Sequence, residues 1–573
     1  MTALLTVQDL RVAYRTARGD VTAVDGVDLE VAPGEVTALV GESGSGKSSV
    51  AQSVIGLLAS NGRVAGGSIR LGDRELTGLS EREFRSVRGR AIGLVPQDPG
   101  NSLNPVATIG ANIAEVLRIH GWKDRVKTRA RVLELLERVD IDDPETRIRQ
   151  YPHELSGGMR QRVLIAAAIA LEPALVIADE PTSALDVTVQ QRVLDLLDRL
   201  RSETGTGVLF ITHDLAVAAE RADRVVVMRN GTVQESGPAD RVFSAPQSDY
   251  TRTLLTDAPS LTQVVVRNRP RADATDTTGR SGPPVRSDLL VVRDLRQEFP
   301  RRGATPLVAV DDVSFRVAVG TTHAIVGESG SGKTTTGRVV AGFARPTAGT
   351  VTVGDTEVTA LRSRRALRDL RRTTQLVYQN PYGSLDPRQS VRRIVREPLD
   401  NFRIGDAAER SDRVAEQLRH VGLAPEIADR LPRELSGGQR QRVAIARALV
   451  LEPRLVVLDE AVSALDVTVQ AQILRLLARL QEELGLTYVF ISHDLAVVRQ
   501  IADTVSVLRR GVQVEHGTAE QVFDQPEHEY TRQLLAAIPG RAGPASVQPA
   551  QPATPAPQEP QEQQEQQEQE AHA

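Results

Sequence analysis

Residues 41–49 read GESGSGKSS, and residues 327–335 read GESGSGKTT. Both fit the pattern Gly-x-x-x-x-Gly-Lys-[Ser/Thr], in which glycines let backbone N–H groups surround phosphate oxygens, the lysine reaches the terminal phosphates, and the hydroxyl is a ligand for Mg²⁺. Each copy follows an apolar run and precedes a stretch with helical spacing. The candidate phosphate-binding residues are Gly41, Ser43, Gly44, Gly46, Lys47, Ser48 and Ser49, and Gly327, Ser329, Gly330, Gly332, Lys333, Thr334 and Thr335.

The rest of the chain repeats in the same order. LVPQDPGNSLNP at 94–105 recurs as LVYQNPYGSLDP at 376–387, and ITHDLAV at 211–217 recurs as ISHDLAV at 491–497. A repeat of this length predicts two homologous domains. We place the first at 1–258, a Pro/Gly/Thr-rich flexible linker at 259–287, the second at 288–540, and a Pro/Gln/Glu-rich disordered tail at 541–573.

Composition excludes several classes of protein. The chain has 573 residues, 40% hydrophobic and 25% charged, which is typical of globular domains. It contains no cysteine, which excludes disulfides, thiolate zinc sites and iron–sulfur clusters. A net charge of -4 gives no global attraction to nucleic acid. The longest apolar run, 163–171, is too short to span a membrane, and the N-terminus lacks the pattern of a signal peptide.

The pattern of apolar runs predicts the fold class. Short β-rich runs at 36–40, 91–95, 174–178 and 208–212 read as buried strands, and 187–203 has helical spacing. Alternation of strand and helix predicts an α/β fold with a mainly parallel sheet. Turn signals in GSIRLGDREL at 67–76 and VVVMRNGTVQE at 225–235 add antiparallel hairpins.

Adjacent acids follow one buried run in each half. LVIADE at 175–180 and LVVLDE at 455–460 supply Asp179 and Asp459 as metal ligands, and Glu180 and Glu460 as bases that polarise an attacking water. Adjacent acids at the end of a strand are often only a solvated turn. Their repetition in register with the glycine-rich loops favours the chemical role.

LSGGM at 155–159 and LSGGQ at 435–439 resemble the signature of the ATP-binding-cassette ATPases. The resemblance implies two tandem P-loop NTPase domains, each with a parallel core, an antiparallel β subdomain and a helical signature subdomain. It also implies ATP and Mg²⁺ as cofactors, and head-to-tail pairing in which each signature contacts the ATP of the opposite half. The signature residues are Ser156, Gly157 and Gly158, and Ser436, Gly437 and Gly438.

The same resemblance gives roles to other residues. Gln97 and Gln379 would contact Mg²⁺ and couple to a membrane partner, and His213 and His493 would lie near the γ-phosphate. SALD at 183–186 and 463–466 matches the D-loop. Tyr14 and Phe299 lie where this family stacks an aromatic ring on adenine, although each also fits an ordinary aromatic residue at the end of a strand.

The segments 97–105 and 379–387, and the extensions 243–259 and 523–539, resemble the peptide-importer branch. That branch implies two separate permease subunits, an external solute-binding protein, peripheral attachment to the cytoplasmic face of the membrane, and no contact with nucleic acid or solute. Three features depart from its pattern. No cysteine is present for the cluster that some members carry, Met159 replaces a glutamine, and Ala461-Val462 replaces Pro-Thr.

The main alternative is a soluble tandem cassette ATPase acting on ribosomes. Proteins of that class usually join their domains by a long charged helical linker, whereas this linker is rich in Pro, Gly and Thr. The importer hypothesis is therefore preferred. The identity of the solute (dipeptide, oligopeptide, glutathione, nickel or another), the equivalence of the two sites and the role of the tail stay open at this point.

Overall fold

The computed structural model describes residues 3–17, 19–183, 185–258, 287–301, 304–463 and 465–539. The expected linker, apart from Ser287, and the expected tail lie outside these residues. Within this part of the chain, every helix is too short or too polar to cross a bilayer.

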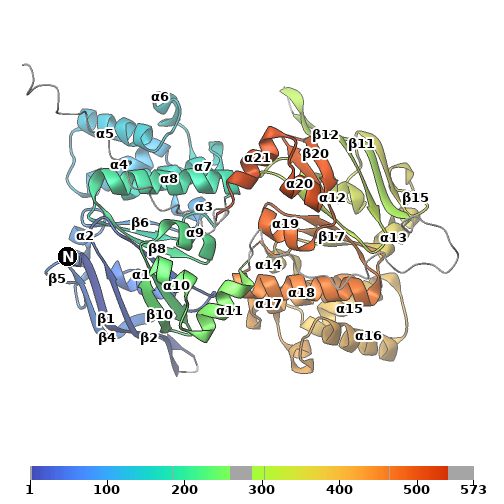
Figure 1. Ribbon diagram of the computed structural model, residues 1–573, viewed down its shortest axis with the longest axis horizontal. Helices are drawn as coiled ribbons and strands as arrows, with labels where there is room; N and C mark the ends of the chain where they lie inside the picture. Colours follow the sequence, from blue (N-terminus) through green and yellow to red (C-terminus); the bar gives the residue numbers. More distant parts are fainter. Residues whose placement is uncertain are drawn as a thin grey trace, which may run out of the picture.

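The first half contains a strand-rich end, a central sheet and a set of surrounding helices (Figure 1). Its strands are β1 (Leu5–Thr16), β2 (Gly19–Val31), β3 (Val36–Gly41), β4 (Gly62–Leu71), β5 (Arg74–Glu75), β6 (Ile92–Val95), β7 (Leu175–Asp179), β8 (Gly207–Thr212), β9 (Arg224–Arg229) and β10 (Thr232–Pro238). Its helices are α1 (Lys47–Val54), α2 (Glu81–Val87), α3 (Pro99–Ser102), α4 (Ile109–Ile119), α5 (Arg125–Arg138), α6 (Pro144–Arg147), α7 (Gly157–Ala168), α8 (Val187–Thr204), α9 (Leu215–Arg221), α10 (Ala239–Ser244) and α11 (Asp249–Asp257).

The second half repeats this order of elements. Its strands are β11 (Asp288–Arg301), β12 (Ala304–Ala318), β13 (Thr322–Val326), β14 (Ala348–Val353), β15 (Thr356–Glu357), β16 (Thr374–Val377), β17 (Leu455–Asp459), β18 (Thr487–Ile491), β19 (Thr504–Arg509) and β20 (Val512–Thr518). Its helices are α12 (Lys333–Val340), α13 (Arg364–Thr373), α14 (Pro381–Ser384), α15 (Val391–Phe402), α16 (Ala407–His420), α17 (Gly437–Leu449), α18 (Val467–Leu484), α19 (Leu495–Ile501), α20 (Ala519–Asp524) and α21 (Glu529–Ala536).

Each central sheet is mainly parallel, which confirms the expected fold class. In the first half the strand order is β10-β9-β3-β8-β7-β6, with only β10 antiparallel to its neighbour. The antiparallel sheet β2-β1-β4-β5 contains the first expected hairpin, and β9 with β10 forms the second. In the second half a single parallel bridge, Asp311 to Val512, joins the two sheets into one of ten strands.

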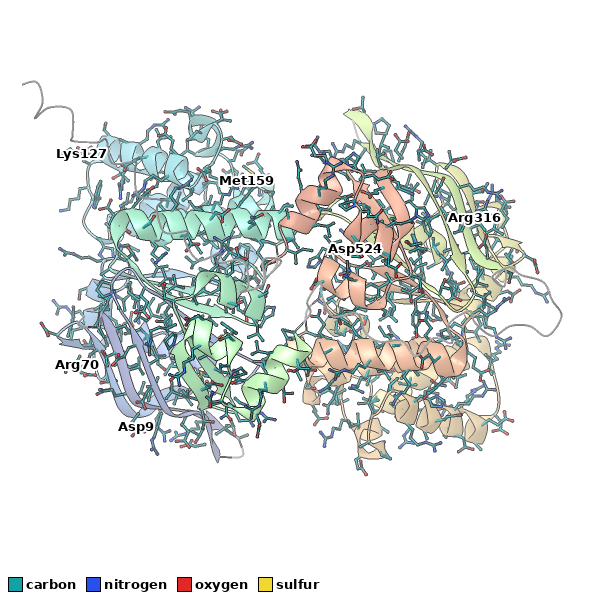
Figure 2. All side chains as sticks on the ribbon, in the orientation of Figure 1. Asp9, Arg70, Lys127, Met159, Arg316 and Asp524 are labelled. Atoms are coloured by element: carbon teal, nitrogen blue, oxygen red, sulfur yellow. The ribbon has the colours of Figure 1, made fainter. Side chains whose placement is uncertain are left out.

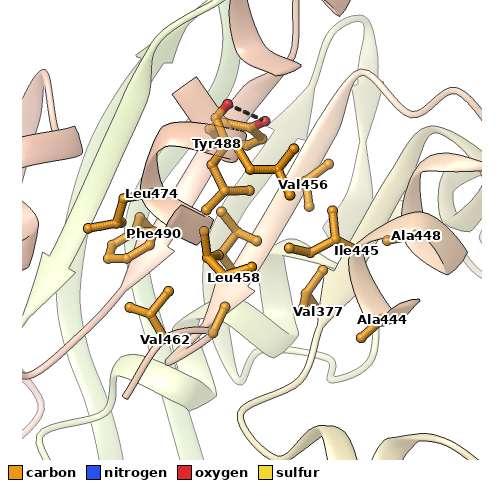
Figure 3. Packing of buried hydrophobic residues seen from close by; sticks show 14 of the residues in the cluster. Val377, Ala444, Ile445, Ala448, Val456, Leu458, Val462, Leu474, Tyr488 and Phe490 are labelled. Atoms are coloured by element: carbon orange, nitrogen blue, oxygen red, sulfur yellow. Dashed lines mark hydrogen bonds between the residues drawn. The ribbon is translucent and has the colours of Figure 1, made fainter. Parts of the chain in front are cut away.

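Both faces of the central sheets are buried, as parallel sheets require. In β3, Leu39 packs into the core beneath the antiparallel sheet, whereas Ala38 and Val40 face the core under the helices. Strand alternation makes this division necessary. Figure 3 shows the equivalent helix-side core of the second half, where the buried Tyr488 hydroxyl donates to the Leu477 carbonyl oxygen at 3.1 Å. Exposed charged side chains such as Arg70, Lys127 and Arg316 lie on the outside (Figure 2).

The two halves lie side by side and meet through the helices that follow each core (Figure 1). Helix α11 of the first half packs on α18 of the second, and α21 of the second packs on α8 of the first. An ion pair between Asp257 and Arg475 joins α11 to α18. The long helices α8 and α18 therefore connect each half to the extension of the other.

We predict that one buried histidine makes the second half sensitive to acid. His323 in β13 stacks on Phe315 with ring centroids 4.3 Å apart, and its Nδ1 lies 2.8 Å from Thr504 Oγ1. Burial, with a smaller effect of His516, lowers the pKa of His323 to about 3. Because the folded-state pKa lies below the unfolded value, this contribution to stability is present in full above about pH 6.5 and is lost as pH falls toward 3.

The first half has Thr37 at the equivalent place in β3, so His323→Thr is the natural replacement. Between pH 7.5 and 4.5 the parent should lose up to about 3 kcal/mol more unfolding free energy than the variant. Urea unfolding at the two pH values measures this difference. Equal losses in parent and variant would contradict the prediction.

Candidate functional site

The two glycine-rich loops connect a central strand to a helix, β3 to α1 and β13 to α12. Gly41 and Gly327 have φ values of 147° and 146°, which side-chain-bearing residues rarely adopt. A Cβ atom at Gly327 would lie 2.1 Å from the carbonyl oxygen of Leu508, and one at Gly41 would lie 2.2 Å from that of Met228. The loop can therefore pass this close to β9 or β19 only with glycine at its first position.

The lysine of each loop is buried and turned back onto the loop. Lys47 Nζ donates to the carbonyl oxygens of Gly41 and Glu42 at 2.7 and 2.9 Å. Lys333 makes the same two bonds to Gly327 and Glu328 at 2.7 and 2.8 Å. Burial lowers the pKa of both lysines, and nearby carboxylates offset part of this effect. An anionic group placed in the loop would find this ammonium already positioned.

The expected metal ligands come together at the ends of β7 and β17. Ser48 Oγ donates to Asp179 Oδ1 at 3.5 Å, and Thr334 Oγ1 donates to Asp459 Oδ1 at 3.0 Å. Burial and the adjacent Glu180 raise the pKa of Asp179 to about 6, and burial raises that of Asp459.

A hydroxyl and a buried carboxylate fit Mg²⁺, which prefers oxygen ligands and uses few from the protein. In the described residues no cluster of three or more His, Cys, Asp or Glu side chains could hold a metal alone. The remaining ligands would be the expected glutamine, Gln97 or Gln379, together with phosphate oxygens and water, which agrees with that preference.

Glu180 and Glu460 are held from two sides. Gln97 Nε2 donates to Glu180 Oε2 at 2.9 Å, and His213 Nδ1 lies 3.1 Å from the same oxygen. Gln379 and His493 contact Glu460 Oε2 at 2.7 and 3.4 Å. The three residues expected at each site are therefore in contact.

Burial is the largest single influence and opposes ionisation of all four groups. The histidine–glutamate bond and the surrounding charges together outweigh it, so the pKa of each carboxyl is lowered and that of each histidine is raised. Both glutamates also have left-handed backbone, with φ values of 46° and 48°. Strain of this kind persists only where the surrounding structure fixes it.

The signature segments begin α7 and α17, and their serines are the N-caps. Ser156 Oγ accepts from Met159 N, and Ser436 Oγ accepts from Gln439 N, each at 3.3 Å. Only the second helix closes a capping box, because Gln439 Oε1 also accepts from Ser436 N at 3.0 Å and methionine has no such acceptor. The Met159 substitution thus removes one hydrogen bond at the start of α7.

Residues from both halves line the cleft above the second loop. This cavity, of about 600 Å³, has Lys333, Thr334 and Phe299 on one side and Ser183, Leu185 and Asp186 on the other. The signature residues 156–158 are not part of its lining. At the first loop, Asp466 Oδ2 accepts from Ser43 N at 3.4 Å. The structure therefore brings each D-loop to the opposite phosphate loop, while the signature stays outside the cleft.

The two aromatic candidates differ in position. Phe299 lies in the cleft with Lys333 and is 43% exposed, so its ring is accessible to a flat ligand. Tyr14 is partly buried against the antiparallel sheet, and its hydroxyl lies 3.1 Å from Ser49 Oγ.

A second cleft of about 1020 Å³ lies beside Gln379 in the second half. Five arginines line it: Arg338, Arg364, Arg368, Arg371 and Arg447. Within the described residues none of the five has a carboxylate within 4.0 Å. The first-half helix α2 instead carries Glu81 and Glu83, and Glu81 pairs with Arg88 at 2.8 Å. The cleft was not predicted from the sequence, although the arginine-rich run RRALRDLRRT at 364–373 was a visible signal.

Comparison with known proteins gives one family for both halves. The ABC transporter family matches residues 24–183 and 310–463, and the family "Oligopeptide/dipeptide transporter, C-terminal region" matches 514–564. The chain is 44% identical to the oligopeptide transport ATP-binding protein OppD of Mycobacterium tuberculosis, over 94% of this chain and 99% of the relative.

Two further relatives have similar coverage. The glutathione import ATP-binding protein GsiA of Escherichia coli is 42% identical over 94% of this chain and 89% of the relative. The peptidoglycan transport ATP-binding protein YejF of Agrobacterium fabrum is 45% identical over 93% and 96%.

We predict unequal effects of alanine at two glycines of the second loop. Gly330 has a φ of 81° but open space around its Cβ position, so Gly330→Ala should cost only the strain of left-handed backbone, about 1–2 kcal/mol. Gly327→Ala adds the collision with Leu508, and overpacking of this kind costs about 1–3 kcal/mol more. Thermal unfolding of the two variants measures the difference. Equal stabilities would show that the loop relaxes around the new methyl group.

Proposed function

This chain belongs to the ABC transporter family, and from that membership we propose that it is the ATP-hydrolysing subunit that drives a membrane importer of peptides. The observation that carries the proposal is the repeated set of loop, hydroxyl–aspartate pair and held glutamate, with residues of one half at the loop of the other. The two units are 1–258 and 288–540, each a cassette with its extension. The two sites would then hold one ATP molecule each, between the halves.

At each site the residues divide the work of phosphoryl transfer. The loop amides and Lys47 or Lys333 hold the phosphates and offset the charge that develops on them. Ser48 with Asp179, and Thr334 with Asp459, would hold Mg²⁺, and Gln97 and Gln379 would complete that set. Bound Mg²⁺ would neutralise charge on the β- and γ-phosphate oxygens.

Glu180 and Glu460 would orient the attacking water and accept its proton, because their lowered pKa values keep them ionised. His213 and His493 hold these carboxylates and face the position of the γ-phosphate. The signature residues 156–158 and 436–438 would close on the opposite nucleotide by a movement of the halves. Tyr14 and Phe299 would contact the adenine.

The arginine-lined cleft beside Gln379 supports a protein partner. Gln379 contacts both this cleft and Glu460, so an occupant of the cleft lies one residue from the proposed base. The five arginines outnumber the two acids that line the same cleft, Glu397 and Asp459, and this excess of positive charge favours an acidic segment in that place. We assign this cleft, and the surface formed by Gln97 and the segment after it, to two membrane-embedded permease subunits.

The names of the relatives support peptides or short peptide-like molecules as the solute, and they favour import over the ribosome alternative. A solute would meet the permeases and an external binding protein, not this chain. Attachment to the permeases would place the chain at the cytoplasmic face of the membrane as a peripheral subunit.

The double variant Glu180→Gln, Glu460→Gln tests the proposed bases. Glutamine keeps the size and most hydrogen bonds of glutamate but cannot accept a proton, so turnover should fall by a factor on the order of 10²–10⁴ while ATP binding persists. Lys47→Ala and Lys333→Ala should weaken binding itself. Phosphate release and equilibrium binding of ATP distinguish the two effects. Turnover near that of the parent would exclude the glutamates as bases.

Arg364→Glu tests the proposed permease contact, and Arg365→Glu is its matched control. Both residues are exposed on α13, but only Arg364 lines the cleft. The purified chain should hydrolyse ATP slowly and be stimulated by its permeases in vesicles. We expect Arg364→Glu to lower that stimulation at least about threefold without changing the basal rate, because charge reversal replaces attraction by repulsion. Equal effects of the two variants would place the contact elsewhere.

A further inference from the structure

The C-terminal extension of the second half contacts its own phosphate loop. Tyr530, the second residue of α21, is 2% exposed, and its hydroxyl oxygen accepts from Glu328 N at 3.3 Å. Arg509 lies over its ring at 4.7 Å from the centroid. Burial and the nearby Glu328 raise the pKa of Tyr530 to about 12, so the phenol is neutral in the physiological range.

Glu328 joins three parts of the protein. Its N–H donates to Tyr530, and its carbonyl oxygen accepts from Lys333 Nζ at 2.8 Å. Its Oε1 shares the hydroxyl proton of Thr188 with Asp186 Oδ1, at 3.1 and 2.9 Å from Thr188 Oγ1. Thr188 belongs to the first turn of α8 in the other half, next to the D-loop residue Asp186. A single loop residue therefore connects the buried lysine, the extension and the opposite half.

Packing between two helices supports this connection between Glu328 and the opposite half. Helix α21, which carries Tyr530, packs on α8, which carries Thr188. The two groups that hold Glu328 thus come from helices that contact each other across the interface. A shift of α8 relative to the second half would change the Thr188 bond directly, and it would act on Tyr530 through the packing of α21 on α8.

The first half has an equivalent tyrosine and threonine, but their hydroxyl groups do not make the corresponding hydrogen bonds to the first phosphate loop. Tyr250 occupies the equivalent position in α11, with Arg229 over its ring at 4.7 Å. Its hydroxyl is buried beside Glu42, and its contact with the Glu42 backbone N–H falls short of hydrogen-bond geometry in this conformation. Among the residues that the structure describes, the buried hydroxyl of Thr468, the counterpart of Thr188, likewise meets no hydrogen-bond partner. The pair of tyrosines is therefore a natural comparison within one chain.

We propose that Tyr530 and Thr188 are positioning residues that act through Glu328 to hold the second phosphate loop in the conformation that binds ATP. The extension, for which no role was known from the sequence, thereby supports nucleotide binding at the second site. Thr188 makes that binding depend on the position of the first half. The proposal rests on the proposed function only in taking ATP as the ligand of the loop.

Binding is the property that these residues control. A phosphate loop without these contacts must become ordered when it binds the phosphates of ATP. The entropy lost in that ordering weakens the affinity for ATP. Neither residue contacts the proposed base or the attacking water, so the chemical step is unaffected. We therefore expect variants of these residues to have a higher Kd for ATP and an unchanged kcat.

The first experiment compares Tyr530→Phe with Tyr250→Phe. Phenylalanine keeps the ring, its burial and the arginine contact, and removes only the hydroxyl. Tyr530→Phe is made in a Lys47→Ala background, so that only the second loop binds tightly, and Tyr250→Phe in a Lys333→Ala background. Calorimetry with a non-hydrolysable ATP analogue and Mg²⁺ measures each Kd.

Loss of one hydrogen bond should raise Kd roughly three- to tenfold for Tyr530→Phe and less than about twofold for Tyr250→Phe. The melting temperature of each purified chain is measured alongside. A Kd for Tyr530→Phe within twofold of its background, or equal changes at the two loops, would overturn the proposal. A change in melting temperature without a change in Kd would also overturn it.

The second experiment tests the connection across the interface. Thr188→Val removes the other bond to Glu328 from the opposite half, and it should also raise the Kd of the second loop. Combined with Tyr530→Phe, it should raise Kd by less than the product of the single effects, because residues acting through one group are not additive. If the double variant raised Kd by the full product of the two single effects, the two residues would act independently and not through Glu328, which would contradict the proposal. These measurements need no permease, so their failure would leave the transport proposal untouched.

Discussion

Each half buries one ammonium group, and the surrounding structure is arranged around its charge. Lys47 lies among the carbonyl oxygens of its own loop and near Asp179, Glu180 and, from the other half, Asp466. A buried cation without such neighbours would be strongly destabilising. The acids at the end of β7 and the opposite D-loop supply negative charge near this ammonium group. The glycines let the loop turn so that its carbonyl oxygens also face it. The interface between the halves is thus part of the electrostatics of each site.

Residues fixed by local pattern were predictable. The glycine-rich loops, the acids after β7 and β17, and the strands that place them could all be found because strand alternation and loop chemistry are local. Family resemblance gave Gln97 and His213 roles near the phosphates, but their contacts with Glu180 were not predicted, since the three lie far apart in the sequence. Because each motif recurs in the same order in both halves, its chemical role could be distinguished from a chance pattern, which a single copy would not have allowed.

Other residues depended on tertiary placement. The tyrosine in DYTR and EYTR was visible as a repeat, but nothing local indicates that its hydroxyl reaches the phosphate loop. The arginines of α13 were visible as a charged helix. Their effect appears only when α13 packs beside Gln379, where the lining arginines outnumber the two lining acids, Glu397 and Asp459. Such contacts are set by packing between distant segments.

Joining two nucleotide-binding units in one chain also has an evolutionary consequence. In a homodimer every substitution appears at both interfaces, so a change that benefits one is accepted only if the other tolerates it. Here Thr188 reaches Glu328, whereas Thr468 meets no hydrogen-bond partner in the part of the chain that the structure describes, and His323 stands where the first half has Thr37. A mutation can therefore be selected at one interface alone. Duplication followed by fusion lets the two halves of a symmetric machine specialise separately.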